Sequence, residues 1–281
     1  FLFKKFFYGL FKLLYKEISE FESANTNLNT EVKQSRLGNN LSYKVYFVKK
    51  SRIYTDTIND TAIISNNKVI EGPSFQIRDF KFENIKKNIV LTKGTPRLKK
   101  KFKGNLASLL TGGAGNNNYW HWLFDVLPRI KILENSYNLE KIDYFLLPNL
   151  EKRFQKETLD ILKIPNKKRL SSIKLRHISA DQIISTDHPY VRNNNASYEI
   201  QNLPDWILNW LRNSFLKEKI FNDNSYPKKI FIDRSDATSN HSELRKILNE
   251  KEIIKELKLD GYKVVRLADI PFIEQVKTFF N

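Results

Sequence analysis

The amino-acid sequence predicts an α/β protein built mainly on a parallel sheet that is covered by helices. Three observations support this prediction. Short β-type runs alternate with stretches of helical periodicity from about residue 106 onward, as in parallel strands joined by crossover helices. The alternation stops at the polar stretch 222–227 and then restarts, which indicates two units. With 281 residues, of which 41 % are hydrophobic, the chain is long enough for packed cores in both.

The N-terminal segment, residues 1–40, is predicted to be a basic amphipathic helix followed by a polar linker. Residues 1–18 carry four Lys and one Glu among aromatic and aliphatic side chains. They are too short and too charged to span a bilayer, which needs roughly 20 apolar residues. Such a helix suits the headgroup plane of a membrane, and it equally suits docking on the protein's own body. Residues 20–40 are mostly polar and show little periodicity, which predicts the linker.

Residues 41–85 are predicted to form a small antiparallel β appendage. β-type runs occupy 43–48 and 61–65. The second run is joined to 68–70 through two consecutive Asn residues, which tolerate the left-handed backbone of a tight hairpin turn. We therefore expect a hairpin at this point.

Residues 86–221 are predicted to form the first Rossmann-like domain, and 228–281 the start of a second. In the first domain the expected strands are 89–92, 106–111, 142–147 and 172–178, and the expected helices are 118–134, 151–164 and 204–219. In the second they are strand 229–233, helix 242–259, strand 262–267 and a helix opened by Asp269 and Pro271. Two strands cannot complete a parallel sheet that is buried on both faces. We therefore expect the second domain to be incomplete and the chain, which has no Met, to be part of a longer protein.

Charge and cysteine content narrow the function classes. A net charge of +17 indicates an anionic partner such as nucleic acid, an anionic membrane or a phosphate-bearing ligand. However, the chain has 35 Lys and only 13 Arg. Arg binds phosphates and base edges better than Lys does, because its guanidinium donates two parallel hydrogen bonds, so this ratio weakens the case for nucleic acid. The Lys surplus also fits an adenine/thymine-rich coding bias, and no nucleic-acid partner is expected. The absence of Cys excludes disulfides and thiol nucleophiles, and it fits a reducing, cytoplasmic location.

The first candidate site lies in the predicted helix 118–134. His121, Asp125 and Arg129 follow one another in steps of four and therefore share one helical face. Together they can take a proton, orient the group that takes it and hold an anion; a solvent-facing, salt-bridged stripe is the alternative. Pro128 favours the functional interpretation, because a proline inside a regular helix costs about 3 kcal/mol and needs compensation.

A glycine-rich bend at 111–118 precedes this helix. Its backbone N–H groups could hold an anion or sugar hydroxyls. The bend matches neither the Gly-x-Gly-x-x-Gly nor the Walker pattern, so it is a weak indication of nucleotide binding.

The second candidate site begins where the strand 229–233 ends. Arg234 follows that strand, and the carboxyl ends of parallel strands line the ligand crevice of open α/β sheets. Arg245, in the first turn of the next predicted helix, adds to a field that would hold a diphosphate. Glu250 lies on the flank of that helix's apolar stripe, where an unpaired carboxylate is costly to bury. It is therefore either a residue of the site or the partner of an Arg.

Several chemistries leave no trace in the sequence. It contains no Gly-x-Ser-x-Gly elbow, no His-Glu-x-x-His pair and no Asp-x-Asp. Transferases that neutralise a leaving diphosphate with a metal commonly display Asp-x-Asp. We therefore expect cationic side chains and helix N-termini in that role, with no metal and no other cofactor. His177 and His188 have no partner pattern and are predicted to be structural.

With these residues in hand, the chain resembles glycosyltransferase family 61, whose bacterial members are often labelled capsular polysaccharide biosynthesis proteins. The run Asn118-Tyr-Trp-His-Trp-Leu-Phe-Asp-Val-Leu-Pro-Arg-Ile130 is similar to the family's Asn-Tyr-x-His-Trp-x-x-Asp-x-x-Pro-Arg signature. The family's second pattern, Arg…Arg-x-x-x-Asn-Glu…Glu-Gln-Val, is matched by Phe231-Ile-Asp-Arg234, Arg245-Lys-Ile-Leu-Asn-Glu250 and Gln275. The likeness spans roughly residues 62 to 281.

The resemblance implies a GT-B architecture, in which two Rossmann-like domains face each other across a cleft. It also implies inverting, metal-independent transfer from a nucleotide sugar, expected to be a UDP-sugar, to a hydroxyl of a glycan acceptor. Matching the family's motifs to this sequence residue by residue implies that His121 and Asp125 are catalytic and that one of them is a general base. It implies that Arg234, Arg245 and Glu250 bind the donor. The acceptor side of the cleft would be lined by Asn118, Trp122 and Arg129.

One departure from the family concerns its His-Gly-Ala-Gly segment, which is tied to nucleotide binding and would lie beyond Asn281. We therefore expect this chain alone to bind UDP-sugars weakly and to be a fragment of the active enzyme. The competing hypothesis is a non-enzymatic anion-binding protein that attaches to membranes or nucleic acid through Lys12, Lys16 and the run 97–103. Contact of residues 1–18 with the inner membrane face is a hypothesis under either interpretation, and such binding weakens with salt.

Overall fold

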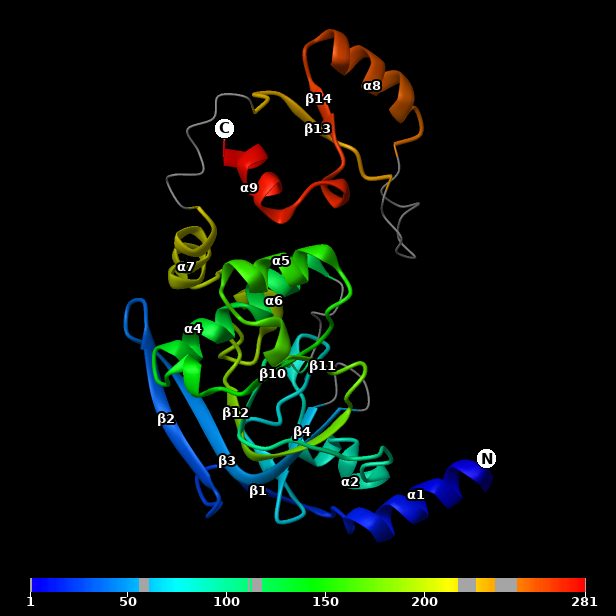
Figure 1. The fold of residues 1–281 in the computed structure, drawn as a ribbon, viewed down its shortest axis with the longest axis vertical. Helices are drawn as coiled ribbons and strands as arrows, with labels where there is room; N and C mark the ends of the chain where they lie inside the picture. The colour runs from blue at the N-terminus through cyan, green and yellow to red at the C-terminus, as the bar shows by residue number, and fades with distance from the viewer. Residues whose placement is uncertain are drawn as a thin grey trace.

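The computed structural model describes residues 2–55, 61–110, 112, 118–216, 226–235 and 247–280. Within these residues the protein is an α/β protein, as predicted, with a ten-stranded mixed sheet in its larger unit (Figure 1). A smaller C-terminal unit lies beside one end of the larger one (Figure 1).

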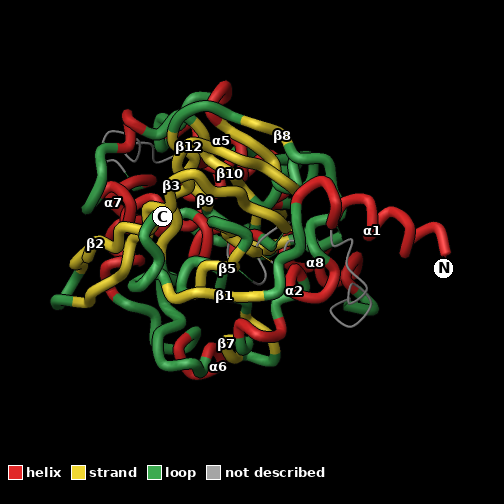
Figure 2. The backbone as a smooth tube through the Cα atoms, turned by 90° about the horizontal axis from the view of Figure 1, so that it is seen from below, coloured by secondary structure: helices red, strands yellow, loops and turns green. Residues whose placement is uncertain are grey.

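The main sheet joins segments from both halves of the larger unit (Figure 2). Its strand order is β1 (Glu20–Ser23), β5 (Lys68–Glu71), β4 (Thr61–Ser65), β3 (Leu41–Thr55), β12 (His177–Thr186), β9 (Asn105–Ser108), β10 (Tyr144–Leu147) and β11 (Arg169–Ser171). In addition, β2 (Thr30–Leu37) pairs with β3 and β8 (Lys100–Lys101) with β12, while β6 (Ile77–Arg78) and β7 (Lys81–Phe82) form a separate hairpin. The strands β12, β9, β10 and β11 run parallel, and β3 runs antiparallel to β12.

The described residues form nine α-helices. They are α1 (Leu2–Tyr15), α2 (Val90–Lys93), α3 (Tyr119–His121), α4 (Pro128–Glu134), α5 (Arg153–Ile161), α6 (Ala196–Glu199), α7 (Asp205–Phe215), α8 (Glu250–Leu259) and α9 (Phe272–Phe280). Of these, α4, α5 and α7 supply side chains to the core against the main sheet. A π-helical segment, η2 (Trp122–Val126), joins α3 to α4. Short 3-10 turns occupy η1 (Ile85–Lys87), η3 (Leu139–Lys141), η4 (Asn166–Lys168) and η7 (Leu267–Asp269).

The prediction of a separate β appendage at 41–85 is wrong. Its main strand, β3, pairs with β12 from Val45 opposite Thr186 to Tyr54 opposite His177, so it belongs to the central sheet. The physical reason is burial. Val45–Val48 and Ser51–Thr55 are buried without alternation, so these parts of β3 have no solvent-exposed face and could not form a separate hairpin. The predicted hairpin between β4 and β5 is confirmed, and Asn66 and Asn67 both have positive φ angles.

The predicted linker at 20–40 is also wrong, because it contains β1 and β2. Both lie outside the most buried part of the sheet and expose many of their polar side chains. An edge position of this kind tolerates the polar composition that made the segment resemble a loop.

Two of the predicted strands in the larger unit also differ from the structure. The expected strand at 89–92 is instead the helical turn α2. The N–H of Val90, its first residue, donates a hydrogen bond to the Asn88 side chain at 3.2 Å, which favours the start of a helix there. The expected strand 172–178 starts only at His177 and continues to Thr186.

The central strands are buried on both faces because alternate side chains enter two different cores. Leu106 and Ile183 belong to one cluster, whereas their neighbours Ala107 and Ile184 belong to the other. The second of these clusters also receives the apolar face of η2 and α4 and side chains of α5 and α7. The helix with the first candidate site is therefore packed directly against the sheet.

The C-terminal end of α1 is attached to the body by Tyr15. Its ring lies edge-on to His177 at 4.9 Å, and its hydroxyl accepts a hydrogen bond from the Lys99 N–H at 3.0 Å. His177 is 1 % exposed, and burial is the main cause that lowers its pKa to about 4. His177 is thus a neutral packing residue here, as predicted. No described helix is both long and apolar enough to cross a bilayer.

In the C-terminal unit, β13 (Ile230–Ile232) and β14 (Lys263–Val265) run parallel, with α8 between them in sequence. The predicted helix start at 242 lies outside the described residues, and the described helix begins at Glu250 after a turn. Helix α9 packs on the larger unit: the Phe272 ring lies 4.9 Å from that of Phe215, and its N–H donates to Glu157 at 2.6 Å.

Candidate active site

The helix of the first candidate site starts at an Asn cap and contains a π turn. The Asn118 side chain accepts hydrogen bonds from the N–H groups of Trp120 and His121, which fixes the first turn. The N–H of Leu127 donates to Trp122 O, five residues back. Pro128 then takes the first position of α4, where a missing N–H is tolerated. The π turn is the compensation that the proline required, and such turns are frequent at functional sites.

His121, Asp125 and His188 meet at one carboxylate oxygen. The Nδ1 atom of His121 lies 2.8 Å from Asp125 Oδ2, and the Nε2 atom of His188 lies 3.9 Å from the same oxygen. Asp125 and His188 are almost fully buried, whereas the side chain of His121 is 24 % exposed. The predicted pair therefore exists, and His121 is its accessible member.

Hydrogen bonding fixes the protonation of this cluster. Burial pulls the pKa of Asp125 upward, but the hydrogen bond from His121 and the nearby imidazole of His188 outweigh it and hold the pKa below its ordinary value. Because the carboxylate is ionised and only accepts, Nδ1 of His121 carries a proton and Nε2 is left to accept one. Nδ1 of His188 accepts from the Val191 N–H at 3.1 Å, so its Nε2–H points toward Asp125.

Tyr190 completes the buried side of the cluster. It is 5 % exposed and packs edge-on against His188, with ring centroids 4.6 Å apart. Burial, followed by the charge of Asp125, raises the pKa of Tyr190. The hydroxyl therefore stays neutral and leaves Asp125 as the only negative charge of the group.

Two residues assigned to the acceptor-side cleft are core residues instead. Trp122 is 0 % exposed, and its indole N–H donates to Thr158 at 2.9 Å. Arg129 is also 0 % exposed and does not extend the polar row toward solvent. The alternative of a solvent-facing stripe is likewise wrong, because the row faces the sheet.

Arg129 joins the helix to the ends of two strands. It donates to the Thr186 hydroxyl and carbonyl, both at 2.9 Å, to the Ser185 hydroxyl at 3.0 Å and to the carbonyl of Leu110. The guanidinium also lies 5.6 Å from the Phe75 ring centroid. Burial is the main cause that lowers the pKa of Arg129 to about 10, so it remains charged at neutral pH. Its function is to hold the helix in place.

Of the predicted glycine-rich bend 111–118 that precedes this helix, the structure describes Gly112 and Asn118. Asn118 is exposed as well as capping, so it remains compatible with an acceptor-side position. The φ of Gly112 is +66°, and its carbonyl accepts from Ile77 N–H at 2.6 Å.

The second candidate site is partly described. Arg234 is exposed and lies two residues after the end of β13, where the sequence predicts it to follow the strand. Beside it, Asp233 accepts from the Ser235 N–H at 2.8 Å, and Arg266 donates to the Ser235 hydroxyl at 2.8 Å. Arg245 lies outside the described residues. Glu250 is half-buried and is the first residue of α8 rather than a residue of its middle.

Sequence reasoning missed His188 and Arg266. His188 lies two residues after β12, and Arg266 directly follows β14, so both follow the ends of strands and lie near candidate site residues. The rule that placed Arg234 would have found Arg266. Among the described residues, no group of three or more His, Asp or Glu side chains is arranged to hold a metal ion.

The structure thus places on an α/β fold a partly exposed histidine, His121, whose Nδ1 is hydrogen-bonded to the buried carboxylate of Asp125. The family model of glycosyltransferase 61 matches residues 119–281, more than half of the chain. The protein therefore belongs to glycosyltransferase family 61, which confirms the resemblance seen in its motifs. The match begins at Tyr119, two residues before His121. A search of curated proteins found no significant match. Family membership implies glycosyltransferase activity, with a nucleotide-sugar donor and a glycan acceptor in general.

Proposed function

We propose that the protein transfers a sugar from a UDP-sugar to a hydroxyl of a glycan acceptor, with inversion and without a metal ion, in the synthesis of a bacterial capsular or related polysaccharide. The observation that carries this proposal is the 2.8 Å contact between His121 and Asp125 in a chain of a glycosyltransferase family. We also propose the GT-B arrangement, with the cleft between the larger unit and the C-terminal unit.

In the proposed reaction His121 is the general base. Its Nε2 takes the proton of the acceptor hydroxyl while the hydroxyl oxygen attacks the anomeric carbon. The bond from that carbon to the diphosphate oxygen breaks, and its electron pair leaves with the nucleoside diphosphate. Attack from the face opposite the leaving group inverts the anomeric configuration. Asp125 keeps the imidazole in the accepting tautomer and stabilises the imidazolium that forms.

The donor diphosphate is assigned to the cations of the C-terminal unit. Arg234, Arg245 and Arg266 would offset the charge that develops on the leaving group. The interface between the units supports this assignment, because the ring of Tyr119 lies 6.3 Å from that of Phe272. Tyr119 is two residues from His121, so the proposed base lies near the junction of the two units.

Sugar transfer can be tested by measuring the release of UDP by the purified protein. The protein is mixed with UDP-glucose, UDP-galactose or UDP-N-acetylglucosamine and a panel of methyl glycosides as acceptors, and UDP release is measured with and without EDTA. We expect at least one pair to release UDP, at an unchanged rate in EDTA. Lack of turnover with every pair would contradict sugar transfer from these donors, and loss of turnover in EDTA would contradict the metal-free mechanism.

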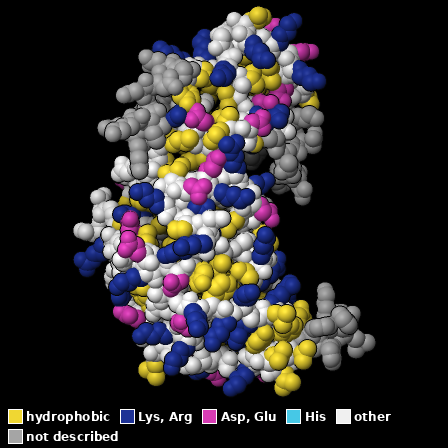
Figure 3. Space-filling view, in the orientation of Figure 1, with side chains coloured by type: hydrophobic (Ala, Val, Ile, Leu, Met, Phe, Trp, Pro, Cys, Tyr) yellow, Lys and Arg dark blue, Asp and Glu magenta, His cyan; other side chains and the backbone are white. Residues whose placement is uncertain are grey.

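We further propose that α1 contacts the anionic surface of a membrane. Leu13 and Leu14 are 81 % and 57 % exposed, and the helix projects away from the body (Figure 1). In the space-filling view its hydrophobic side chains form a group at the lower right, with Lys and Arg side chains on the neighbouring surface (Figure 3). The basic run 97–103 is attached to the end of this helix, where the Lys99 ammonium lies 5.1 Å from the Tyr15 ring centroid. Exposed Leu side chains beside Lys suit the headgroup region of anionic lipid.

The double variant Leu13→Glu/Leu14→Glu is expected to lower binding to vesicles of phosphatidylglycerol and phosphatidylcholine by at least about tenfold, because two Leu side chains no longer enter the interface. Binding is measured by co-sedimentation at two salt concentrations. The matched control is Leu248→Glu/Leu259→Glu, which changes two exposed Leu residues of the C-terminal unit. Equal loss in both double variants, or no loss in the first, would contradict a role for α1.

A further inference from the structure

A cavity of about 420 Å³ is lined in part by the buried side chain of His188, and the proposed reaction does not use it. Its walls come from β3, from the segment after β5, from β7 and from the segment after β12. The residues that define its chemistry are Tyr46, Phe75, Phe82, Asp187, His188 and Arg192. The cavity is therefore built by chain segments from both halves of the larger unit.

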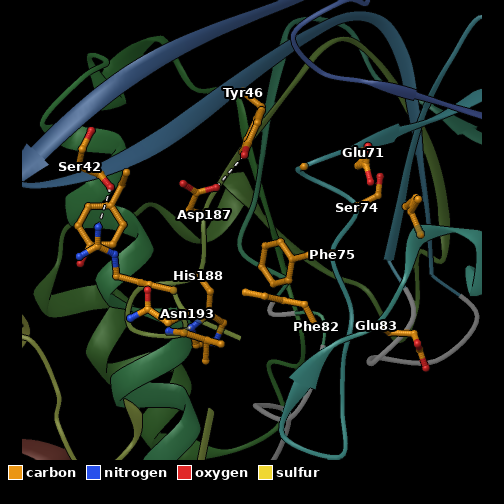
Figure 4. Close-up of a pocket in the computed structure, with 15 residues that line it drawn as sticks. Ser42, Tyr46, Glu71, Ser74, Phe75, Phe82, Glu83, Asp187, His188 and Asn193 are labelled. Atoms are coloured by element: carbon orange, nitrogen blue, oxygen red, sulfur yellow. Dashed lines mark hydrogen bonds between the residues drawn. The ribbon is translucent and has the colours of Figure 1, made fainter. Parts of the chain in front are cut away.

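One side of the cavity is aromatic. The rings of Phe75 and Phe82 are 5.7 Å apart in an edge-to-face arrangement, and both are half-buried. In Figure 4 both rings lie in the pocket below Tyr46. Phe75 is fixed from behind, because the buried guanidinium of Arg129 lies 5.6 Å from its ring centroid. The negative face of such a ring attracts polarised C–H groups, and these cover the apolar face of a sugar ring.

Another part of the wall presents a carboxylate with remaining hydrogen-bonding capacity. Asp187 accepts from the Tyr46 hydroxyl at 2.7 Å (Figure 4). Its other oxygen accepts from the Lys44 N–H, also at 2.7 Å. Each carboxylate oxygen has a further lone-pair site that can accept from a ligand hydroxyl. The segment that bears Asp187 is held in place further along, where Glu199 accepts the N–H of Arg192 at 2.8 Å. The acceptor group is therefore fixed before a ligand arrives.

The charge of the cavity identifies the class of ligand. Among the described residues that line it, Glu71, Glu83 and Asp187 are acidic and Arg192 is basic, in a chain with a net charge of +17. Glu83 is neutralised by Lys87 at 3.0 Å, which leaves Glu71 and Asp187 against Arg192. This negative balance disfavours the phosphates of the donor. A fixed carboxylate together with two aromatic rings instead suits a neutral molecule with both hydroxyl and C–H faces.

The cavity is adjacent to the proposed base through one side chain. His188 lines it, packs edge-on to Phe75 at 6.1 Å, and directs Nε2 toward Asp125, which binds His121. We infer that the cavity binds a neutral sugar residue of the glycan acceptor. The acceptor role rests on the proposed sugar transfer, whereas binding of a neutral sugar does not.

The inference is tested by saturation-transfer NMR on the 281-residue chain, with no donor present. The probes are the methyl glycosides of glucose, galactose, N-acetylglucosamine and rhamnose. We expect saturation transfer to the ring C–H protons of at least one of them. In the double variant Phe75→Ala/Phe82→Ala, we expect the affinity for that glycoside to fall at least about fivefold, because both aromatic faces are removed.

The matched control is Phe102→Ala, which removes a half-buried aromatic ring outside the cavity, paired with Tyr144 at 4.9 Å. It should bind the glycoside as the unchanged chain does. If the double variant fails to fold by circular dichroism, Phe82→Ala and Asp187→Asn are used singly, and each should weaken binding. No saturation transfer from any probe, or unchanged affinity in the folded cavity variants, overturns the inference.

This outcome is separable from that of the proposed function. Glycoside binding that depends on Phe75 and Phe82, in a protein that turns over no UDP-sugar, would keep the sugar site and contradict sugar transfer. Sugar transfer by a protein whose cavity binds none of the probes would keep the proposed function and contradict the sugar site.

Discussion

Replacement of His121 by Ala is expected to lower the rate of sugar transfer by roughly 10²- to 10⁴-fold, because general-base catalysis contributes about that factor. The loss should fall on kcat, because His121 acts on the acceptor hydroxyl while the donor diphosphate is assigned to the C-terminal unit. Asp125→Asn should cause a loss of similar order, since an amide in its place no longer stabilises the imidazolium. Transfer is measured as UDP release by the purified protein, and donor affinity by calorimetry.

A second histidine on the same sheet provides the control. His177 packs against Tyr15 at the far end of β12 and takes no part in the cluster of His121 and Asp125. His177→Asn should therefore leave kcat within about threefold of the unchanged protein at a temperature where both are folded. A His121→Ala protein that is folded, binds the donor and keeps its kcat within the same range would rule out His121 as the base.

Replacement of Arg129 by Ala is expected to lower the free energy of unfolding by about 3–5 kcal/mol. The change leaves a cavity behind a fully buried side chain and removes the donors to two buried carbonyls, those of Leu110 and Thr186. The family signature contains this Arg, and its position in the structure makes its effect one of stability. The change is measured by urea denaturation.

Lys131→Ala is the matched control for Arg129→Ala. Lys131 lies two residues further along the same helix, and its ammonium pairs with Glu134 at 2.9 Å near the surface. Its loss should change the free energy of unfolding by no more than about 0.5 kcal/mol. An Arg129→Ala protein within about 1 kcal/mol of the unchanged one would contradict the structural role, and Arg129 would have to be reconsidered as a site residue.

Local spacing was enough to predict the parts of the site that depend on one helix. His121 and Asp125 are four residues apart, so their contact follows from helical geometry alone. Pro128 likewise indicated that the helix could not be regular, and the structure meets this with a π turn. The hairpin at Asn66 and Asn67 was predictable for the same reason, since tandem Asn specifies the turn locally.

What the sequence could not provide depends on segments far apart in the chain. His188 reaches Asp125 only because β12 ends beside the π turn, and no spacing rule connects the two residues. Arg129 looked like a site residue because its charge suits an anion, yet its partners are carbonyl and hydroxyl groups at strand ends. The edge strands were missed because solvent exposure allows them a polar composition that resembles a loop.

Chemical rescue tests most directly whether His121 is the base that Asp125 orients. The side chain of His121 is 24 % exposed, so free imidazole can enter the space left by His121→Ala. Millimolar imidazole should raise the UDP-release rate of His121→Ala at least roughly tenfold, because it restores the missing proton acceptor. It should not raise the rate of Arg234→Ala, which retains the base. If the unsubstituted protein is active and imidazole does not raise the rate of His121→Ala, the account is contradicted. Equal stimulation of His121→Ala and Arg234→Ala would contradict it as well.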